Sequence, residues 1–223
     1  MMENNNKVFW DSAVSGDLAK VSAMIKAGVD VNLRNGEGRT ALMRTVKRGY
    51  YDIASFLIDN GADVNAVDNN NKTALMGAAK KGELDICRLL IACKADVNTR
   101  DSKGRTALMR ASLLGNSDIV DLLIIKGAEV NLKDNEGRSA LSEACVAYNR
   151  DIIKSLLLAK ADINVQDNRG CTVLMRAAYT GYVELVTFLL DNGADKEIED
   201  NEGRKAIHYV RKENLDDLKG ILK

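Results

Sequence analysis

The sequence predicts an all-α fold, an α-solenoid of stacked helix-turn-helix units joined by hairpin loops. Three observations predict this class. One line of sequence recurs every 33 residues without an insertion. Each copy places helix-starting and helix-ending residues at the same positions, with apolar residues between them. No copy is long enough to bury its own apolar side, so neighbouring copies must stack on one another.

The first half of each copy predicts a short helix. A hydroxyl side chain stands where that helix should begin, and it can accept a hydrogen bond from an otherwise unpaired backbone N–H. Glycine then stands where the helix should end. The line reads GRTALMRTVKRG from residue 38, and its copies begin at residues 71, 104, 137, 170 and 203. The hydroxyl residues are Thr40, Thr73, Thr106, Ser139 and Thr172, and the glycines are Gly49, Gly82, Gly115 and Gly181.

The second half of each copy predicts another helix followed by a tight turn. An acidic residue opens this helix, where negative charge suits the helix dipole. These acids are Asp52, Asp85, Asp118, Asp151 and Glu184. The unit closes on GADVN at 61–65, KADVN at 94–98, GAEVN at 127–131 and KADIN at 160–164. An Asp, two polar residues and usually a Gly follow, which is typical of a hairpin turn.

A unit reading D-x-x-G-x-T-A-L-M-x-A-A…G…LL…GADVN resembles the ankyrin repeat, and the resemblance covers nearly the whole chain. It implies five full repeats between an N-terminal capping repeat in 1–34 and a C-terminal capping repeat in 200–223, in one continuous domain. The family's consensus has Pro and His where this chain has Ala41 and Met43, a TALM form similar to many bacterial ankyrin proteins. The five repeats are 35–67, 68–100, 101–133, 134–166 and 167–199.

The two ends should close the stack differently. We expect residues 1–6 to be disordered and residues 7–32 to form a capping helix pair. At the other end, Arg211 stands in a column of small residues that should face the next unit, and a buried unpaired arginine would be costly. The stack should therefore end with residues 205–223 as a polar capping helix pair. The small column is Val46, Ala79, Ser112, Cys145 and Ala178.

Departures from the repeat mark weak points. Lys94 and Lys160 replace a glycine where a left-handed residue is expected, at a cost of about 1 kcal/mol each. In the fourth repeat, Tyr148 replaces the mid-unit glycine, and Ser142 and Glu143 interrupt the Leu-Met-Arg line. We expect that repeat to open first.

Composition argues against catalysis. Lys plus Arg and Asp plus Glu are both 32, and only 4% of residues are aromatic, which disfavours an aromatic-lined ligand cavity. The single histidine and four cysteines form no CxxC or HExxH spacing, and no phosphate-binding glycine loop is present. We expect no enzyme activity, catalytic residue, cofactor or metal. Cys171 is either an exposed reactive thiol or an incidental cysteine.

Nothing in the sequence predicts a membrane segment. No apolar run reaches the length of a membrane span, and MMENNNKVFW at the start lacks a signal-peptide core. A leader that had been removed would leave no trace. We expect a cytoplasmic monomer with no membrane partner.

In ankyrin-like stacks, the first helices and the loop tips line a concave surface that generally binds proteins. Basic residues dominate that side here, and we expect them to bind a partner protein. They are Arg39, Lys72, Arg105 and Arg138 after the loop glycine, Arg44, Arg110 and Arg176 on the first helix, and Lys47 and Lys80 near its end, with Leu113 and Tyr179 as apolar neighbours.

Each part of this surface has a second interpretation. The Arg39 column can simply pair with the neighbouring Asp68 column, whereas Arg44, Arg110 and Arg176 have no acid in register, which favours binding. The apolar stretch at Leu113–Leu114 and Val146–Ala147 serves either a partner or helix packing. A second acidic column, represented by Asp63, is expected to hydrogen-bond its own loop.

The sequence therefore predicts a protein-interaction module whose partner has an acidic surface or segment. The alternative is a polyanion binder, for nucleic acid or a phosphorylated segment. Nucleic acid is disfavoured because few aromatic residues are available for base stacking and the aspartates repel phosphate.

Overall fold

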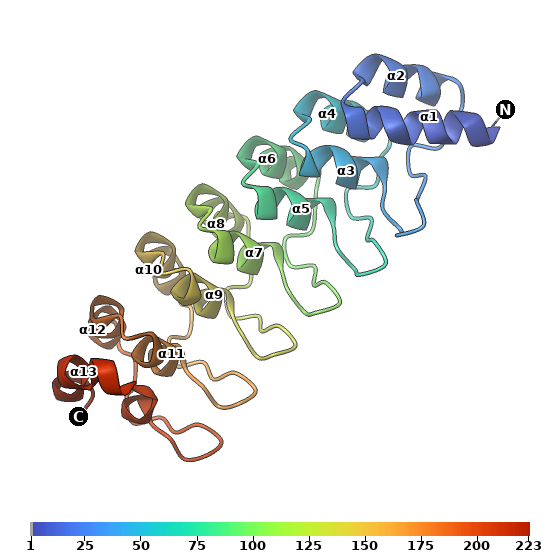
Figure 1. Cartoon of the computed structure of the whole chain (residues 1–223). Coiled ribbons are helices and arrows are strands. Elements are labelled where there is room, and N and C mark those ends of the chain that lie inside the picture. The colour runs from blue at the N-terminus through green and yellow to red at the C-terminus, as the bar shows by residue number, and fades with distance from the viewer. Residues whose placement is uncertain (1) are drawn as a thin grey trace. The chain divides into compact units, whose positions relative to one another are not determined.

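The computed structural model describes residues 2–223, and Figure 1 shows the course of the chain. Every regular element in the described residues is a helix, so the predicted all-α class is confirmed. The α-helices are α1 (Met2–Ser15), α2 (Leu18–Lys26), α3 (Ala41–Lys47), α4 (Tyr51–Asp59), α5 (Ala74–Lys81), α6 (Leu84–Ala92), α7 (Ala107–Leu114), α8 (Ser117–Ile125), α9 (Ala140–Val146), α10 (Arg150–Leu158), α11 (Val173–Thr180), α12 (Val183–Asp191) and α13 (Leu215–Leu222). Two 3-10 helices, η1 (Ala206–Tyr209) and η2 (Lys212–Asn214), precede α13.

The chain divides into two compact units. The first unit comprises the residues up to Ala107 together with Ile125–Ala128, and the second comprises Leu108–Ile124 and Glu129–Lys223. In the first unit, α3 packs against α1, α4 and α5. In the second, α11 packs against α9, α12 and η1. Within each unit the helices form successive pairs, with a hairpin loop leading into the first helix of the next pair (Figure 1). We call the first helix of a pair the inner helix and the second the outer helix.

Leucine columns form the core of both units. From α3 to α12, one leucine of each inner helix and one of each outer helix is almost completely buried, and burying such a side chain stabilises the fold by about 1.5–3 kcal/mol. Methionines that recur every 33 residues are also buried, namely Met43, Met76, Met109 and Met175. The buried leucines are Leu42, Leu75, Leu108, Leu141 and Leu174 on inner helices and Leu57, Leu90, Leu123, Leu156 and Leu189 on outer helices.

Hydroxyl caps begin the inner helices as predicted. The Thr40 side chain accepts a hydrogen bond from the backbone N–H of Met43 at 3.4 Å, and Thr73 accepts one from Met76 at 3.3 Å. Ser139 and Thr172 cap α9 and α11 in the same way. The caps are buried, so the bond also satisfies a backbone donor that water cannot reach.

An aspartate fixes each hairpin loop after the first, in which Asn35 takes its place. Asp68 Oδ1 accepts the backbone N–H groups of Asn70 and Lys72 at 2.8 and 3.0 Å. The loops that begin at Asp101, Asp134, Asp167 and Asp200 repeat both bonds. Because only one carboxylate oxygen is used in the turn, the second oxygen is left to face a side chain.

Neighbouring hairpins approach so closely that glycine is required between them. A Cβ atom on Gly137 or on Gly170 would lie 2.7 Å from the backbone nitrogen of Asn168 or of Asn201, respectively. Both glycines also have a positive φ, 79° and 77°. The close spacing of the hairpins therefore depends on a residue with no side chain.

An asparagine near the end of each repeat joins that repeat to the next one. Asn65 Nδ2 donates to the carbonyl of Lys94 at 3.1 Å, and Asn65 Oδ1 accepts the backbone N–H of Asp96 at 2.8 Å. Asn32 makes the same pair of bonds in the first unit, and Asn131 and Asn164 make it in the second. We call these four residues the asparagine bridges.

The second acidic column hydrogen-bonds its own loop, as predicted. Asp63 Oδ1 accepts the backbone N–H of Asn65 at 2.9 Å, and so holds the backbone that carries the bridge. Asp30, Asp96, Asp162 and Asp195 accept the equivalent N–H groups in their loops.

The non-glycine residues at left-handed positions behave as the sequence predicts. Lys94 and Lys160 both have φ of 67°, and Tyr148 has φ of 52°. The Tyr148 ring is stacked on Tyr182 of the next repeat, with centroids 5.1 Å apart. Such a pair contributes about 0.5–1.5 kcal/mol, which offsets part of the backbone cost at Tyr148. The fourth repeat thus replaces a permissive glycine with a contact between repeats.

The two ends differ from the prediction. Residues 2–6, expected to be disordered, belong to α1, and residue 1 lies outside the described residues. The final pair is not two α-helices, because its first member is replaced by η1 and η2. Arg211 between them donates to the carbonyl of Tyr179 at 2.9 Å and to that of Thr180 at 3.5 Å. Its charge therefore meets the C-terminal carbonyls of α11, a favourable place for a cation.

We expect Asn65→Ala to lower the free energy of unfolding by about 1–2 kcal/mol, since two hydrogen bonds between repeats are lost. Urea denaturation followed by circular dichroism measures the change. Asn60→Ala is the control, because the Asn60 side chain bonds to the Phe56 carbonyl of its own helix. A loss no larger than in the control would show that the asparagine bridges contribute little.

We also expect the amide protons of residues 134–166 to be the least protected from hydrogen exchange among the five full repeats. The left-handed Tyr148 costs about 1 kcal/mol in that repeat, and Tyr182→Ala should increase exchange there further by removing the stacked ring. Finding 134–166 to be the best-protected repeat would contradict this prediction.

Candidate binding surfaces

The arginines that follow the loop glycine pair with acids. Arg138 donates to Asp134 Oδ2 at 3.0 and 3.2 Å, and Arg204 Nε donates to Asp200 Oδ2 at 2.8 Å. Arg39 lies 3.6 Å from Asp68 of the next repeat, because its own loop begins with an asparagine rather than an aspartate. These three arginines therefore pair with hairpin aspartates, as one of the two interpretations of this column expects.

A glutamate two residues before the arginine completes the same network. Glu136 lies 3.2 Å from Arg138, Glu202 lies 2.9 Å from Arg204, and Glu37 pairs with Arg39. Loops that read Glu-Gly-Arg thus hold their arginine between two carboxylates.

The pKa of Asp134 is lowered, so the carboxylate of such a loop stays charged. Burial acts to raise this pKa, but hydrogen bonds from the backbone and side chain of Arg138 and from the backbone of Glu136 lower it below its ordinary value. The carboxylate is therefore fully charged at neutral pH and anchors the hairpin.

The remaining residues of this column also lie beside their aspartates. Lys72 and Arg105 are half-buried, and their backbone N–H groups donate to Asp68 and Asp101.

A group of basic residues without acid partners lies on α3 and α5 of the first unit. We define the basic cluster as Arg44, Lys47, Lys80 and Lys81. None of the four forms an ion pair within the part of the chain that the structure describes. Arg44 is half-buried and the three lysines are exposed. Partial burial lowers the pKa of Lys47, and the nearby positive charges, Arg44 first among them, lower it further.

The three arginines expected on the inner helices have different surroundings. Arg44 belongs to the basic cluster, and Arg110 is half-buried on α7 in the second unit. The expectation that Arg176 has no acid in register is wrong, because its guanidinium lies 2.5 Å from Asp167 Oδ2. The reason is local: Cys171 occupies the place of the loop arginine, so Asp167 Oδ2 is available to the next basic side chain.

The pKa of Asp167 responds to this substitute partner. Burial acts to raise it, whereas the hydrogen bonds from the Arg176 side chain and from the backbone N–H groups of Cys171 and Arg169 lower it below the ordinary value. Arg176 thus replaces the missing loop arginine electrostatically, and from a different element.

Cys171 is buried rather than exposed, which corrects the reactive-thiol alternative. Only 7% of the residue is exposed, and its Sγ lies 3.1 Å from the Tyr209 hydroxyl. Tyr209 donates to Asp200 Oδ2 and accepts from Arg204 at 3.2 Å. Burial and the hydrogen bond to Asp200 raise the pKa of Tyr209, so this hydroxyl stays protonated.

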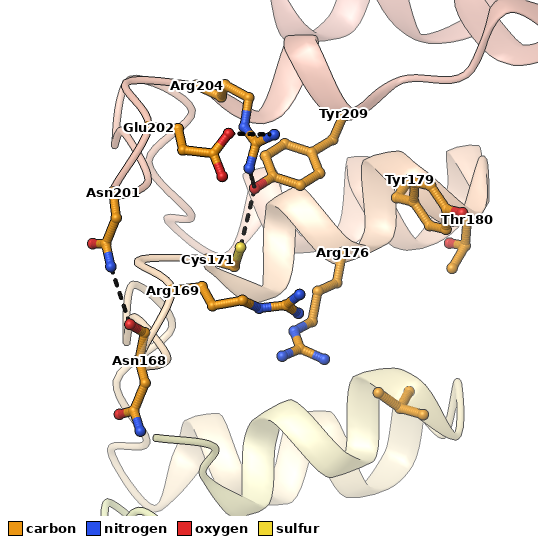
Figure 2. Close-up of a pocket in the computed structure, with 11 residues that line it drawn as sticks. Asn168, Arg169, Cys171, Arg176, Tyr179, Thr180, Asn201, Glu202, Arg204 and Tyr209 are labelled. Carbon is orange, nitrogen blue, oxygen red and sulfur yellow. Dashed lines mark hydrogen bonds and ion pairs between the residues drawn. The ribbon is translucent and has the colours of Figure 1, made fainter. Parts of the chain in front are cut away.

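These residues line a groove in the second unit. It has a volume of about 670 Å³ and lies between α9, α11, η1 and the two last hairpins (Figure 2). We call it the second-unit groove. It is lined by Val146, Asn168, Arg169, Cys171, Arg176, Tyr179, Thr180, Asn201, Glu202, Arg204 and Tyr209.

Most apolar residues of the predicted surface are exposed rather than packed between helices. Val146 is 59% exposed and Tyr179 is 56% exposed, and both line the groove. Leu114 is 49% exposed on α7, whereas Leu113 beside it is half-buried. Arg211 lies over the Tyr179 ring, 5.3 Å from its centroid, and so holds the ring in place.

Arg169 is a groove residue that the sequence reasoning missed. It stands where the first, fourth and sixth copies of the line have Glu37, Glu136 and Glu202. The signal was present in the fifth copy, which reads Arg-Gly-Cys in place of Glu-Gly-Arg. Aligning only the columns of basic residues misses Arg169, because the arginine precedes the glycine in this copy and follows it in the Glu-Gly-Arg copies.

Two further observations bear on function. None of the helices in residues 2–223 is long and apolar enough to cross a membrane. In the same residues, no three His, Cys, Asp or Glu side chains gather in a way that could hold a metal ion.

We expect Arg176→Gln to lower the free energy of unfolding by about 1–2 kcal/mol at neutral pH, because Asp167 loses its charged partner. The folded-state pKa of Asp167 is lowered, so this contribution is full above about pH 4, the ordinary aspartate pKa. It is lost as the pH falls through the lowered value. Urea titrations at several pH values measure it, with Arg169→Gln as the control. A difference that does not change with pH would contradict the assignment.

Comparisons with known proteins agree with the repeat architecture. A family model described as ankyrin repeats (3 copies) matches residues 9–101, 61–134, 77–167 and 141–223. An ankyrin repeat protein of Rickettsia felis (strain ATCC VR-1525 / URRWXCal2) is 42% identical over 60 residues. That match covers 26% of this chain and only 20% of the Rickettsia protein.

A solved structure shares the fold over almost the full length. The ankyrin repeat domain of Bcl-3, a member of the IkappaB protein family, matches with a TM-score of 0.82 at 25% identity. The match covers 96% of this chain and 97% of the Bcl-3 domain chain. Together with the family model, which spans most of the sequence, it shows that this chain belongs to the ankyrin repeat family.

Proposed function

We propose that this protein is a non-catalytic interaction module that binds an acidic segment of a partner protein, with the basic cluster of the first unit as its main contact. The fold is typical of protein–protein interaction modules, which supports a protein as the partner. One observation supports an acidic partner: in the described residues, no ion pair is formed by Arg44, Lys47, Lys80 or Lys81.

Repulsion within the basic cluster supports this proposal. Partial burial lowers the pKa of Lys47 most, and the positive charges of Arg44, Arg39, Lys81 and Lys80 lower it further. Like charges held this close by two short helices are relieved by an opposite charge from outside. An acidic segment provides that charge, and complementary charge increases both the rate of association and the selectivity for a partner.

The titratable groups with shifted pKa values support a binding role rather than catalysis. Asp134 and Asp167 have lowered pKa values because they anchor hairpins, which is a structural use of a carboxylate. Burial raises the pKa of Cys87 and of Cys145 to about 12. Such thiols stay protonated and are poor nucleophiles. Catalytic acids and nucleophiles are instead tuned toward the working pH.

The alternative is a polyanion, which the same cluster would attract. Lysines bind phosphate as point charges, so Lys47, Lys80 and Lys81 suit this ligand too. A protein partner is favoured because α3 and α5 offer no exposed aromatic side chain for a base to stack on.

The proposal is tested by affinity capture from a lysate of the cells that make the protein, at low and at high salt. We expect the charge-reversal variant Arg44→Glu/Lys47→Glu/Lys80→Glu to lose a protein that the unchanged chain retains. Retention should also weaken with salt, because exposed charges are screened. Arg176 is left unchanged, since Asp167 needs it.

The matched control is Arg88→Glu/Lys126→Glu/Lys154→Glu, which changes the net charge equally at exposed positions on or just after outer helices. Both variants are first checked for unchanged thermal unfolding. Equal capture by the two variants would overturn the role of the basic cluster. A captured species that nuclease treatment removes would identify the polyanion instead.

A further inference from the structure

We propose that the second-unit groove binds a peptide in which a carboxylate side chain lies next to a bulky aliphatic side chain. Arg169 and Arg176 hold the carboxylate, and Val146 with Tyr179 holds the aliphatic group. This inference rests on the proposed function in one respect, that the chain binds acidic protein segments. It assigns a second contact, with its own chemistry, in a different unit.

The fifth hairpin and Arg176 together have more positive than negative charge. The fourth and sixth hairpins each hold one arginine between an aspartate and a glutamate. The fifth hairpin has one carboxylate, Asp167, for two arginines, because Arg169 replaces the glutamate. This hairpin together with Arg176 therefore has one positive charge in excess, and the Arg169 side chain forms no ion pair in the described residues.

The arrangement of the two arginines also supports a carboxylate ligand. Figure 2 shows the Arg169 and Arg176 side chains converging on the same part of the groove. The Arg169 side chain is exposed and forms no hydrogen bond or ion pair within the described residues. Arg176 gives one amino group to Asp167. An incoming anion thus meets one complete guanidinium and the remaining donors of another.

Both carboxylates of the sixth hairpin contact Arg204. Asp200 faces Arg204 and Tyr209, and Glu202 faces Arg204. Hydrogen bonds from Tyr209 and Arg204 outweigh the effect of burial and lower the pKa of Asp200, so its charge is already compensated. The Arg204 charge is used within this network, which leaves Arg169 as the cation that faces a ligand.

The opposite side of the groove is apolar and held in shape. Val146 is 59% exposed, although an aliphatic residue at this point of an inner helix gains nothing from contact with water. The Tyr179 ring is fixed from behind by Arg211, which stacks on it and bonds to its carbonyl. A preformed apolar wall beside a guanidinium selects a ligand with both properties, because ordering the wall costs little on binding.

A carboxylate is the oxyanion we commit to. A phosphate group carries close to two negative charges at neutral pH, whereas the fifth hairpin with Arg176 has one positive charge in excess. One carboxylate matches that excess. Guanidinium and carboxylate also pair through two parallel hydrogen bonds, a geometry that a single exposed arginine can provide.

The test uses short acetylated and amidated peptides and NMR spectra of the full chain. The probe contains leucine followed by glutamate. Four comparison peptides replace the glutamate with glutamine, lysine or phosphoserine, or the leucine with alanine. We expect saturable shifts at the Val146 methyl groups, the Tyr179 ring and the Arg169 Nε–H with the leucine–glutamate peptide. The glutamine peptide should bind at least about tenfold more weakly, because a charge-assisted hydrogen bond is lost.

Variants separate the two halves of the groove. Arg169→Gln should abolish the preference for glutamate over glutamine, whereas Arg150→Gln, an exposed arginine that stacks on Phe188, should preserve it. Val146→Ser should weaken binding of the leucine peptide and leave that of the alanine peptide unchanged. Both positions are exposed, so the fold does not depend on them.

Several results would overturn the inference. These are equal affinity for the glutamate and glutamine peptides, shifts located away from the groove, or no saturable shift with the leucine–glutamate peptide. Tighter binding of the phosphoserine peptide would overturn the carboxylate assignment and identify phosphate. If the Arg44/Lys47/Lys80 variant keeps its selectivity for glutamate and its protein capture is unchanged, the proposed function is wrong and the groove assignment stands. Capture by the basic cluster without any peptide selectivity would count against the groove alone.

Discussion

Each hairpin of this protein after the first depends on one carboxylate whose two oxygens have different partners. Oδ1 of the hairpin aspartate accepts two backbone N–H groups and sets the shape of the turn, as in Asp68. Oδ2 faces outward to a basic side chain, as in Asp134 and Asp200. Because the turn needs the carboxylate charged and buried, a cation beside it is favoured in every repeat. The positions of the arginines follow from this constraint.

The same constraint explains why a neutral protein presents local positive charge. An arginine that is held by several carboxylates has little left for a ligand, and Arg138 with Asp134, Glu136 and Glu143 is an example. Charge becomes available to a partner only where bases exceed acids within one small neighbourhood. This happens in the first unit, where Lys80 and Lys81 lie beside Arg44 and Lys47. It happens again in the fifth hairpin, where an arginine has replaced the glutamate.

Departures from the repeat are matched by contacts with a neighbouring repeat. Tyr148 loses the freedom of glycine and gains a stacked partner in Tyr182. Cys171 removes an arginine, and Arg176 takes over its aspartate while Tyr209 of the final repeat meets the thiol. Arg211 replaces a small buried residue and caps the carbonyls at the end of α11. In a stack where each repeat touches only its neighbours, a local cost has to be offset at the next interface.

The sequence by itself determined the helices, their caps, the hairpins and the order of the repeats. These features depend on interactions between residues close in the chain, such as Thr40 with Met43 and Asp68 with Lys72, and a period of 33 residues displays them in columns. It also located the basic side chains of α3 and α5. Only the tertiary structure decided which of the basic residues are neutralised. Arg176 and Asp167 are nine residues apart, and Cys171 meets Tyr209 across 38 residues, so their contacts depend on how the hairpins and helices pack. Charge pairing depends on distances of a few ångströms, and a column of aligned residues contains no such distances.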